Sequence, residues 1–390
     1  MLNLNQKDFP MAKTLTYLNS ASISLMPRPA IESMIRFQRK IASGGTIGFD
    51  EDAETRALED ARDQAAALLR AHRDEVAILS SATDGICSLA WALEIRRGSN
   101  VVSTDADFPS VVYPWMRLGE GRGIKVRLAK NQDGVVGTDE MERLVDDKTV
   151  VLSISHVEYG TGQRFDLRRL SELAHSHGSF LVVDATQSAG LVPIDVHRDG
   201  VDALVAGGYK GLLGPFGAAI FYVKRELAKR LVPPFAGWRS TRVPYNLDAT
   251  RLTFAKDVKK FECSTLNYAS PIGLNESMRY LRRLGHGNVT RHVLLLTGKM
   301  IEAVQADDRL RGTRVLTPTQ QQSHASIASF RFKTRNQSDI AAELVRRKII
   351  VSQRFNGVRF SFHVYNTVED IAAALKVLDQ MTNNRRLFKA

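Results

Sequence analysis

The chain has 390 residues, of which 44% are hydrophobic and 25% charged, a composition typical of a soluble globular protein with one large domain and a smaller one. No apolar run approaches the roughly 18 residues of a membrane span, and the N-terminal segment lacks the basic start and apolar stretch of a signal peptide. We therefore expect a cytoplasmic protein with no membrane partner.

The net charge of +12 raises the question of nucleic-acid binding. The excess lies in short pairs such as Arg168-Arg169 and Arg282-Arg283, typical of solvated helix faces, and aromatic residues make up only 7% of the chain. Nucleic acid is therefore not the expected partner, and the charge suits an anionic cofactor and substrate. Cys87 and Cys263 are too few and too far apart for a disulfide framework or a zinc site, so we expect reduced thiols and no metal.

The first half of the chain predicts a helix followed by a parallel sheet. A long amphipathic helix is predicted at residues 52–71, with a break at Gly44-Gly45 ahead of it. From about residue 76 to residue 223, short β-branched runs alternate with helical patterns, as in βαβ units. Strands are predicted at residues 76–80, 100–103, 125–128, 150–155, 180–184, 203–206 and 218–223. Helices are predicted between them at residues 84–92, 139–145 and 166–175.

The second half predicts a smaller unit. A Pro-rich surface loop begins at Val232. Beyond it, helices are predicted at residues 271–284, 289–304, 338–347 and 368–381, and strands at residues 325–332 and 358–363. The fold class is therefore α/β, with a large domain (residues 15–270) built on a mostly parallel seven-stranded sheet. A smaller α+β C-terminal domain comprises residues 271–390 together with residues 1–14.

Polar residues follow several of the predicted strands, where ligands gather in open α/β sheets. Ser81-Ala-Thr-Asp-Gly follows the first strand and opens a helix. Its backbone amides, Ala82 among them, and the Thr83 hydroxyl can hold a phosphate at the positive end of that helix. The alternative is that Thr83 or Asp84 only caps the helix.

Asp184 and Lys210 end two successive apolar strands. The flanks of Asp184 are too apolar to leave a carboxylate without a partner, which is a pyridinium nitrogen, a helix cap or an internal ion pair. Lys210 is expected to be partly desolvated, which favours the neutral amine needed to condense with an aldehyde. Gly207, Gly208 and Gly211 let the backbone approach a bulky planar ligand. The pair suits a pyridoxal phosphate enzyme, although a lysine after a strand is more often a surface lysine.

The order and spacing of eight motifs along nearly the whole chain carry a family resemblance. They are Tyr17-Leu-Asn-Ser-Ala-Ser, Ser81-Ala-Thr-Asp-Gly, Asp107-Phe-Pro-Ser-Val-Val-Tyr-Pro-Trp, Ser155-His-Val, Asp184-Ala-Thr-Gln-Ser-Ala-Gly, Tyr209-Lys210, Thr265-Leu-Asn-Tyr and Arg359-Phe-Ser-Phe-His-Val-Tyr-Asn-Thr. With these motifs the chain resembles the class V aminotransferases, a family of fold-type I enzymes that includes cysteine desulfurases, selenocysteine lyases, kynureninases and isopenicillin epimerase-like proteins.

The resemblance implies a role for each matching residue. Lys210 is expected to bind the aldehyde of pyridoxal 5'-phosphate covalently, Asp184 to pair with the ring nitrogen, and Gln187 to contact the ring hydroxyl. Ala82 and Thr83 are expected at the phosphate. Thr265 is expected to reach the phosphate of a second subunit, which implies a homodimer with a shared active site. Arg359 is expected to bind the substrate carboxylate, which its planar guanidinium suits.

Several positions depart from the family pattern. Many relatives have histidine and serine where this chain has Tyr209 and Gly207, so the phosphate site changes one donor and loses one hydroxyl. Phe108 stands where desulfurases stack a histidine on the ring; it can stack but cannot carry a proton. Tyr159 stands near the position of an asparagine. Residues 351–358 lack the nucleophilic cysteine of desulfurases, and Cys263 does not match its position.

The expected enzyme therefore acts on a small amino acid through removal of its α-proton. A carbon–sulfur or β-elimination lyase or an aminotransferase, without a persulfide cysteine, is ranked first. An amino-acid epimerase, or a non-enzymatic protein that retains the fold, is the alternative. A nicotinamide-dependent dehydrogenase is disfavoured because no Gly-x-Gly-x-x-Gly follows the first strand of the sheet.

Overall fold

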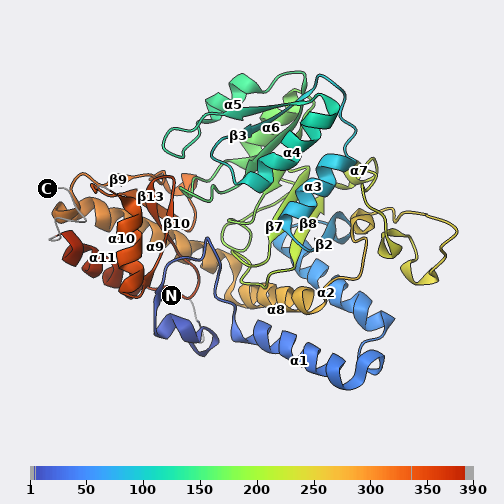
Figure 1. Ribbon diagram of the computed structural model, residues 1–390, viewed down its shortest axis with the longest axis horizontal. Coiled ribbons are helices and arrows are strands. Elements are labelled where there is room, and N and C mark those ends of the chain that lie inside the picture. Colours follow the sequence, from blue (N-terminus) through green and yellow to red (C-terminus); the bar gives the residue numbers. More distant parts are fainter. Residues whose placement is uncertain (1–3, 5, 335, 383–390) are drawn as a thin grey trace.

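The computed structural model describes residue 4, residues 6–334 and residues 336–382 (Figure 1). Its largest element is a seven-stranded sheet in the order β2-β8-β7-β6-β5-β3-β4. The strands are β2 (Val76–Leu79), β3 (Asn100–Thr104), β4 (Lys125–Ala129), β5 (Thr149–Ser155), β6 (Phe180–Asp184), β7 (Ala203–Gly207) and β8 (Ala219–Val223). All seven predicted strands are present, and the mostly parallel sheet is confirmed: only β8 runs opposite to its neighbours.

Helices cover both faces of this sheet, which is why its central strands β7 and β8 are apolar and buried along their whole length. The helices are α2 (Glu51–Leu69), α3 (Ala82–Ala92), α4 (Pro109–Arg122), α5 (Thr138–Leu144), α6 (Leu167–Ser176) and α8 (Ala269–Leu284). On one face, α2, α5, α6 and α8 pack on alternate strand residues such as Ile78 and Leu204. On the other face, α3 and α4 pack on the intervening residues, such as Ala77 and Val205.

Two long helices, α1 (Arg28–Gly44) and α4, and the short helix α7 (Arg225–Ala228) were not predicted from the sequence. Helix α1 lies along α8 (Figure 1). Helix α4 contains Pro114, Gly119 and Gly121, residues that argue against a helix in a sequence pattern. At Gly119 a Cβ atom would lie 2.6 Å from the carbonyl oxygen of Ile124, so glycine is the residue that lets the chain fold back closely into β4.

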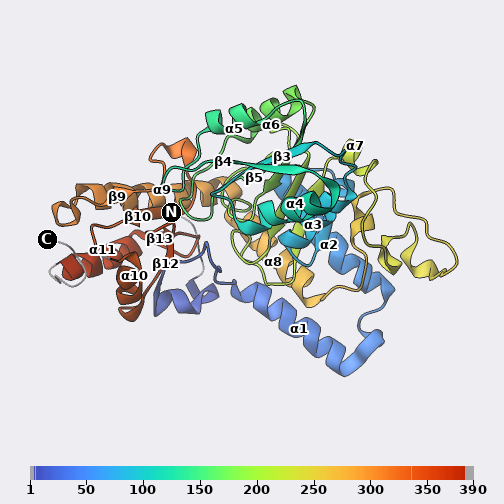
Figure 2. The same cartoon turned by 45° about the horizontal axis from the view of Figure 1, so that its top comes forward.

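The C-terminal part forms a second layered unit at the other end of the molecule (Figure 2). Its antiparallel sheet has the order β12-β13-β10-β9. The strands are β9 (Arg314–Val315), β10 (Ile327–Arg331), β12 (Ser352–Arg354) and β13 (Gly357–Ser361), and the helices are α9 (His286–Ala306), α10 (Gln337–Arg346) and α11 (Val368–Thr382). They enclose a separate apolar core that includes Phe330, Phe360 and Leu378.

Two segments near the expected domain boundaries connect the units. Strand β1 (Thr16–Tyr17) pairs in parallel with β11 (Ile349–Ile350) of the C-terminal unit. Helix α8, expected in the smaller domain, packs against α1 and α2 and contributes Leu274 and Met278 to the core of the large sheet. The division after residue 270 stays a prediction. Among the described residues, no helix combines the length and apolar character needed to cross a lipid bilayer.

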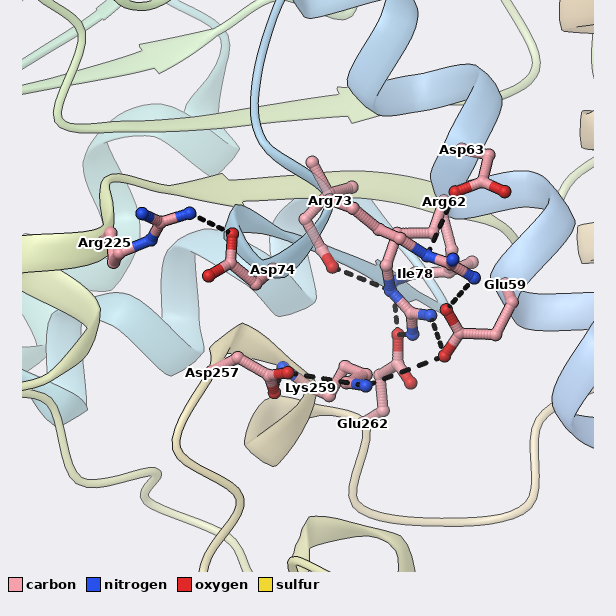
Figure 3. Close-up of polar contacts among 11 residues, drawn as sticks. Glu59, Arg62, Asp63, Arg73, Asp74, Ile78, Arg225, Asp257, Lys259 and Glu262 are labelled. Carbon is pink, nitrogen blue, oxygen red and sulfur yellow. Dashed lines mark hydrogen bonds and ion pairs between the residues drawn. The ribbon is translucent and has the colours of Figure 1, made fainter.

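A buried ion-pair network anchors α2 over the start of β2 (Figure 3). Arg62 is only 1% exposed. Its guanidinium contacts the Glu262 carboxylate at 2.6 Å and donates through Nε to the carbonyl oxygen of Val76 at 2.9 Å. The same Glu262 oxygen accepts from the Ile78 N–H at 2.8 Å, and Glu59 lies 2.5 Å from Arg62 Nη1, so the buried guanidinium has two carboxylates beside it.

Candidate active site

The carboxyl ends of β5, β6 and β7 and the first turn of α3 enclose one cavity. Its lining consists of Ser81, Ala82, Thr83, Phe108, Ser110, Ser155, Val157, Tyr159, Asp184, Thr186, Gln187, Gly207, Tyr209 and Lys210. The structure therefore brings together the residues predicted to hold the cofactor, with the exception of Thr265. Thr265 is exposed and does not line the cavity of its own chain.

Lys210 lies in the turn after β7 and is 9% exposed. Burial lowers the pKa of its amine to about 8; the Asp184 carboxylate opposes this change, whereas Arg359 and Arg354 add to it. The amine lies 5.4 Å from the ring centre of Phe108 and 5.5 Å from that of Tyr209. A substantial fraction of the amine is therefore neutral near physiological pH, as attack on a carbonyl requires.

Asp184 ends β6, and its carboxylate faces the same cavity. One carboxylate oxygen accepts from the Thr186 N–H at 2.8 Å. Burial raises the pKa of Asp184, and Lys210 partly offsets this effect. A buried carboxylate at a cavity wall is stabilised by a cationic partner in the cavity, and a protonated pyridine nitrogen fits that position.

The N-terminus of α3 lies at the phosphate end expected from the sequence. Ser81 is the N-cap residue, because its hydroxyl accepts from the Asp84 N–H at 3.0 Å. Thr83 is therefore not the cap, and its hydroxyl donates to Ser110 Oγ at 2.8 Å. Amides in the first turn of a helix lack intrahelical partners and attract anions. The capping alternative for Thr83 is wrong, and the residue is available to a ligand in the cavity.

The other residues expected at the cofactor ring are each oriented by a contact within the protein. The Gln187 amide donates to the Ala21 carbonyl oxygen at 2.9 Å. Tyr209 stacks on Phe216 with ring centres 4.4 Å apart. Phe108 meets Tyr159 edge to face at 5.4 Å, so two aromatic rings frame the cavity near Lys210.

Arg359 lies on β13 and is 1% exposed. Its guanidinium donates to Ser352 Oγ at 3.1 Å, to Ser22 Oγ at 2.7 Å and to the Tyr159 carbonyl oxygen. Burial and the neighbouring Arg354 lower the pKa of Arg359 to about 9. Within the described residues its partners are all neutral. A buried cation without an anionic partner is stabilised by a ligand carboxylate.

Sequence reasoning missed a group of buried carboxyls beside Asp184. Asp107 accepts from the Ser155 N–H at 2.8 Å and from Thr104 Oγ1 at 3.0 Å, and burial raises its pKa to about 6. Glu158 is fully buried. One of its oxygens has a single contact with Thr104 at 3.4 Å, and the other has no partner in the described structure. Burial together with Asp107 raises the pKa of Glu158 well above its usual value, which favours the neutral form of this acid.

A second missed feature is the tight turn between β12 and β13. Phe355 and Asn356 form this two-residue turn with φ of 47° and 55°, and Arg354 pairs with Gly357 across it. Arg331 donates to the carbonyl oxygens of both turn residues. The Phe355 ring lies 5.5 Å from that of Tyr159. The turn therefore brings Arg354 toward the site. Its hairpin is local in the sequence, and Asn356-Gly357 is a turn signal that the sequence analysis did not use.

Comparisons with known proteins agree with this geometry. The model of the aminotransferase class-V family matches residues 16–374. The uncharacterized aminotransferase YcbU of Bacillus subtilis is 31% identical over 94% of this chain and 94% of its own. The apo structure of a cysteine desulfurase from Thermococcus onnurineus has a TM-score of 0.87 at 25% identity, covering 98% of this chain and 99% of that one. The cystine C–S lyase C-DES, solved with cysteine persulfide, has a TM-score of 0.87 at 22% identity, covering 95% and 99%.

The fold and the site define a fold-type I enzyme that depends on pyridoxal phosphate. The chain belongs to the aminotransferase class V family, since the family model spans nearly its whole length. The expected family, fold class and cofactor are confirmed. The roles of individual residues stay predictions, and they enter the proposal below.

Proposed function

We propose that this enzyme removes the α-proton of a small amino acid and acts as a carbon–sulfur or β-elimination lyase or as an aminotransferase. The observation that carries the proposal is the convergence of Lys210 and Asp184 on one cavity, with the buried guanidinium of Arg359 close enough to lower the pKa of Lys210. The amine, the acid and the carboxylate-binding cation are the three groups that such chemistry on an amino acid needs.

Each residue has a distinct task in this proposal. Bound pyridoxal phosphate supplies an electron sink for the bonds at the α-carbon. Lys210 would hold the cofactor covalently and, as a neutral amine, would take the α-proton of the substrate. Asp184 would hold a proton at the ring nitrogen. Arg359 would orient the substrate carboxylate, and Phe108 would offer its ring face to the cofactor.

The absence of a protein persulfide is part of the proposal. The chain has two cysteines, Cys87 on α3 and Cys263 after η7 (Val258–Phe261). Burial and Asp84 raise the pKa of Cys87, which disfavours its thiolate. The β12–β13 connection consists of Phe355 and Asn356, so it offers neither a thiol nor a long loop to carry one. Sulfur, if the substrate contains it, then leaves as a free product.

Three assays on one amino-acid panel test the proposal and separate its branches. Pyruvate with ammonia indicates elimination, amino transfer that depends on a keto acid indicates an aminotransferase, and loss of chirality indicates the epimerase alternative. Lys210→Ala is the control for each activity. Activity in one of the first two assays that disappears in Lys210→Ala supports the proposal, whereas silence in all three overturns it.

We also propose a homodimer with a shared active site in the cytoplasm. Support comes from Thr265, exposed and outside its own cavity, and from segment 232–256, drawn in yellow, which projects from the body (Figures 1 and 2). Phe235, Leu247 and Leu252 of this segment are exposed apolar residues. Light scattering of the purified enzyme gives its mass. A monomer, or undiminished cofactor affinity in Thr265→Ala, contradicts the shared site.

A further inference from the structure

A second group of candidate ligands lies at the opposite edge of the large sheet from the cavity. His72 and Glu75 border η4 (Arg73–Glu75), just before β2, and His197 lies in the loop between β6 and β7. One ligand atom from each residue lies within 4.8 Å of the other two. Glu75 Oε2 is 3.1 Å from His197 Nε2, and the rings of His72 and His197 are 5.1 Å apart.

We propose that His72, Glu75 and His197 bind a zinc ion. Two imidazole nitrogens and one carboxylate oxygen form a ligand set that suits Zn²⁺, whereas Ca²⁺ and Mg²⁺ prefer oxygen ligands throughout. Tetrahedral ligand atoms about 2.1 Å from zinc lie roughly 3.4 Å from one another. The separation of 3.1 Å between Glu75 and His197 is close to that value, and small rotations of the exposed imidazoles bring in the third ligand.

The carboxylate is positioned in the way that a metal ligand requires. Glu75 is 1% exposed; its Oε1 accepts from the Arg225 N–H at 3.0 Å and its Oε2 from the His72 N–H at 2.9 Å. These bonds fix the carboxylate with Oε2 toward the two rings. The Arg225 guanidinium is not its partner, because it pairs with Asp74 at 2.8 Å (Figure 3). The positive charge that this buried carboxylate needs is thus left to the imidazoles or to an ion.

The two histidines are held on rigid backbone but remain open to solvent. The Val196 N–H donates to the Leu69 carbonyl oxygen at 3.1 Å, which attaches the His197 loop to the end of α2. Asp199 accepts from the Asp195 N–H at 3.0 Å within the same loop. Both imidazoles are exposed, so an ion can enter. A bound ion then links the α2–β2 connection to the β6–β7 loop.

A hydrogen bond between His197 and Glu75 is the simpler explanation of their contact, but it leaves two features unexplained. It does not account for the third candidate ligand atom, on His72, which lies within 4.8 Å of the other two. It also leaves the hydroxyl of Tyr222, buried with its ring 6.4 Å from that of His197, without a partner in the described structure. Three protein ligands leave a fourth zinc position for water, which adds a polar group at this site.

Zinc titration of the tag-free holoenzyme tests the proposal. Isothermal titration with zinc chloride at neutral pH is expected to show one ion per chain with a dissociation constant in the micromolar range or tighter. His72→Ala and His197→Ala are each expected to weaken binding at least about tenfold. His177→Ala is the matched control, because His177 forms a similar contact with Asp147 at 2.9 Å. Its affinity for zinc is expected to equal that of the parent.

Two results overturn the proposal: no saturable zinc binding by the parent enzyme, or binding that persists unchanged in the double variant His72→Ala/His197→Ala. A thermal melt of each variant without zinc checks that it is folded. With zinc, the melting temperature is expected to rise in the parent and in His177→Ala and to stay constant in the double variant. These readouts do not depend on catalysis, so their outcome is separate from that of the proposed function.

Discussion

The lowered pKa of Lys210 predicts how cofactor attachment depends on pH. The pKa falls from 10.5 to about 8. At pH 7 the neutral fraction of the amine is then roughly 10%, about 300-fold more than for an unperturbed lysine. Covalent attachment of pyridoxal phosphate to the apoenzyme needs the neutral amine, so its rate is expected to rise with pH up to about 8 and to level off above it.

Stopped-flow absorbance of the band that borohydride bleaches gives the attachment rate, and Lys210→Ala gives the background. Arg354→Gln is an internal check: it removes a cation that lowers the pKa of Lys210, so the pH at which the rate levels off is expected to move upward. A rate that climbs without a break to pH 10, or a profile that Arg354→Gln leaves unmoved, refutes the assignment of the low pKa to burial and neighbouring cations.

Four further predictions follow from individual contacts. Asp184→Asn is expected to lower kcat at least about 100-fold with the covalent cofactor retained, measured by steady-state kinetics and the visible spectrum. Arg359→Lys is expected to raise KM about 10- to 100-fold, because it loses the planar guanidinium, and an unchanged KM contradicts its role. Glu262→Gln removes the buried anion beside Arg62 and leaves only the partly exposed Glu59 to pair with that guanidinium, so it is expected to cost about 2–3 kcal/mol in urea unfolding, against less than about 1 kcal/mol for the more exposed Asp63→Asn. Burial favours the neutral form of Glu158, so its replacement by a neutral amide of the same shape in Glu158→Gln is expected to leave activity within about threefold of the parent; a large loss shows that Glu158 acts as an anion.

The large sheet could be predicted because each of its strands is marked by residues that are neighbours in the sequence. Each strand is a short β-branched run, and burial on both faces keeps these runs apolar along their length. Helix α4 was missed because Pro114 and Gly119 contradict the helical pattern, although close packing requires that glycine. Helix α8 was predicted, but the sequence did not reveal that it packs under the large sheet. Such packing depends on contacts between distant segments.

The same distinction between local sequence signals and tertiary contacts applies to the residues of the candidate site. Asp184 and Lys210 could be selected from the residues alone, because each follows an apolar strand at the edge where ligands bind. The role of Arg359 came only from the family resemblance. The burial of Glu158 and the approach of Arg354 come from tertiary contacts that leave no periodic signal. His72 and His197 meet only after the sheet has formed, so the sequence pattern did not indicate the proposed zinc site.

The buried carboxyls explain which acid remains available to a cation in the cavity. Like charges in a low dielectric cannot all ionise, so protons collect on the carboxyl with the fewest donors. Glu158 has a single contact, at 3.4 Å, whereas Asp107 accepts three hydrogen bonds, at 2.8, 3.0 and 3.3 Å. Asp184 has the Thr186 amide and the opposing charge of Lys210. A neutral Glu158 removes one negative charge from the surroundings of Asp184, which favours the anionic form of Asp184 where the ring nitrogen is expected.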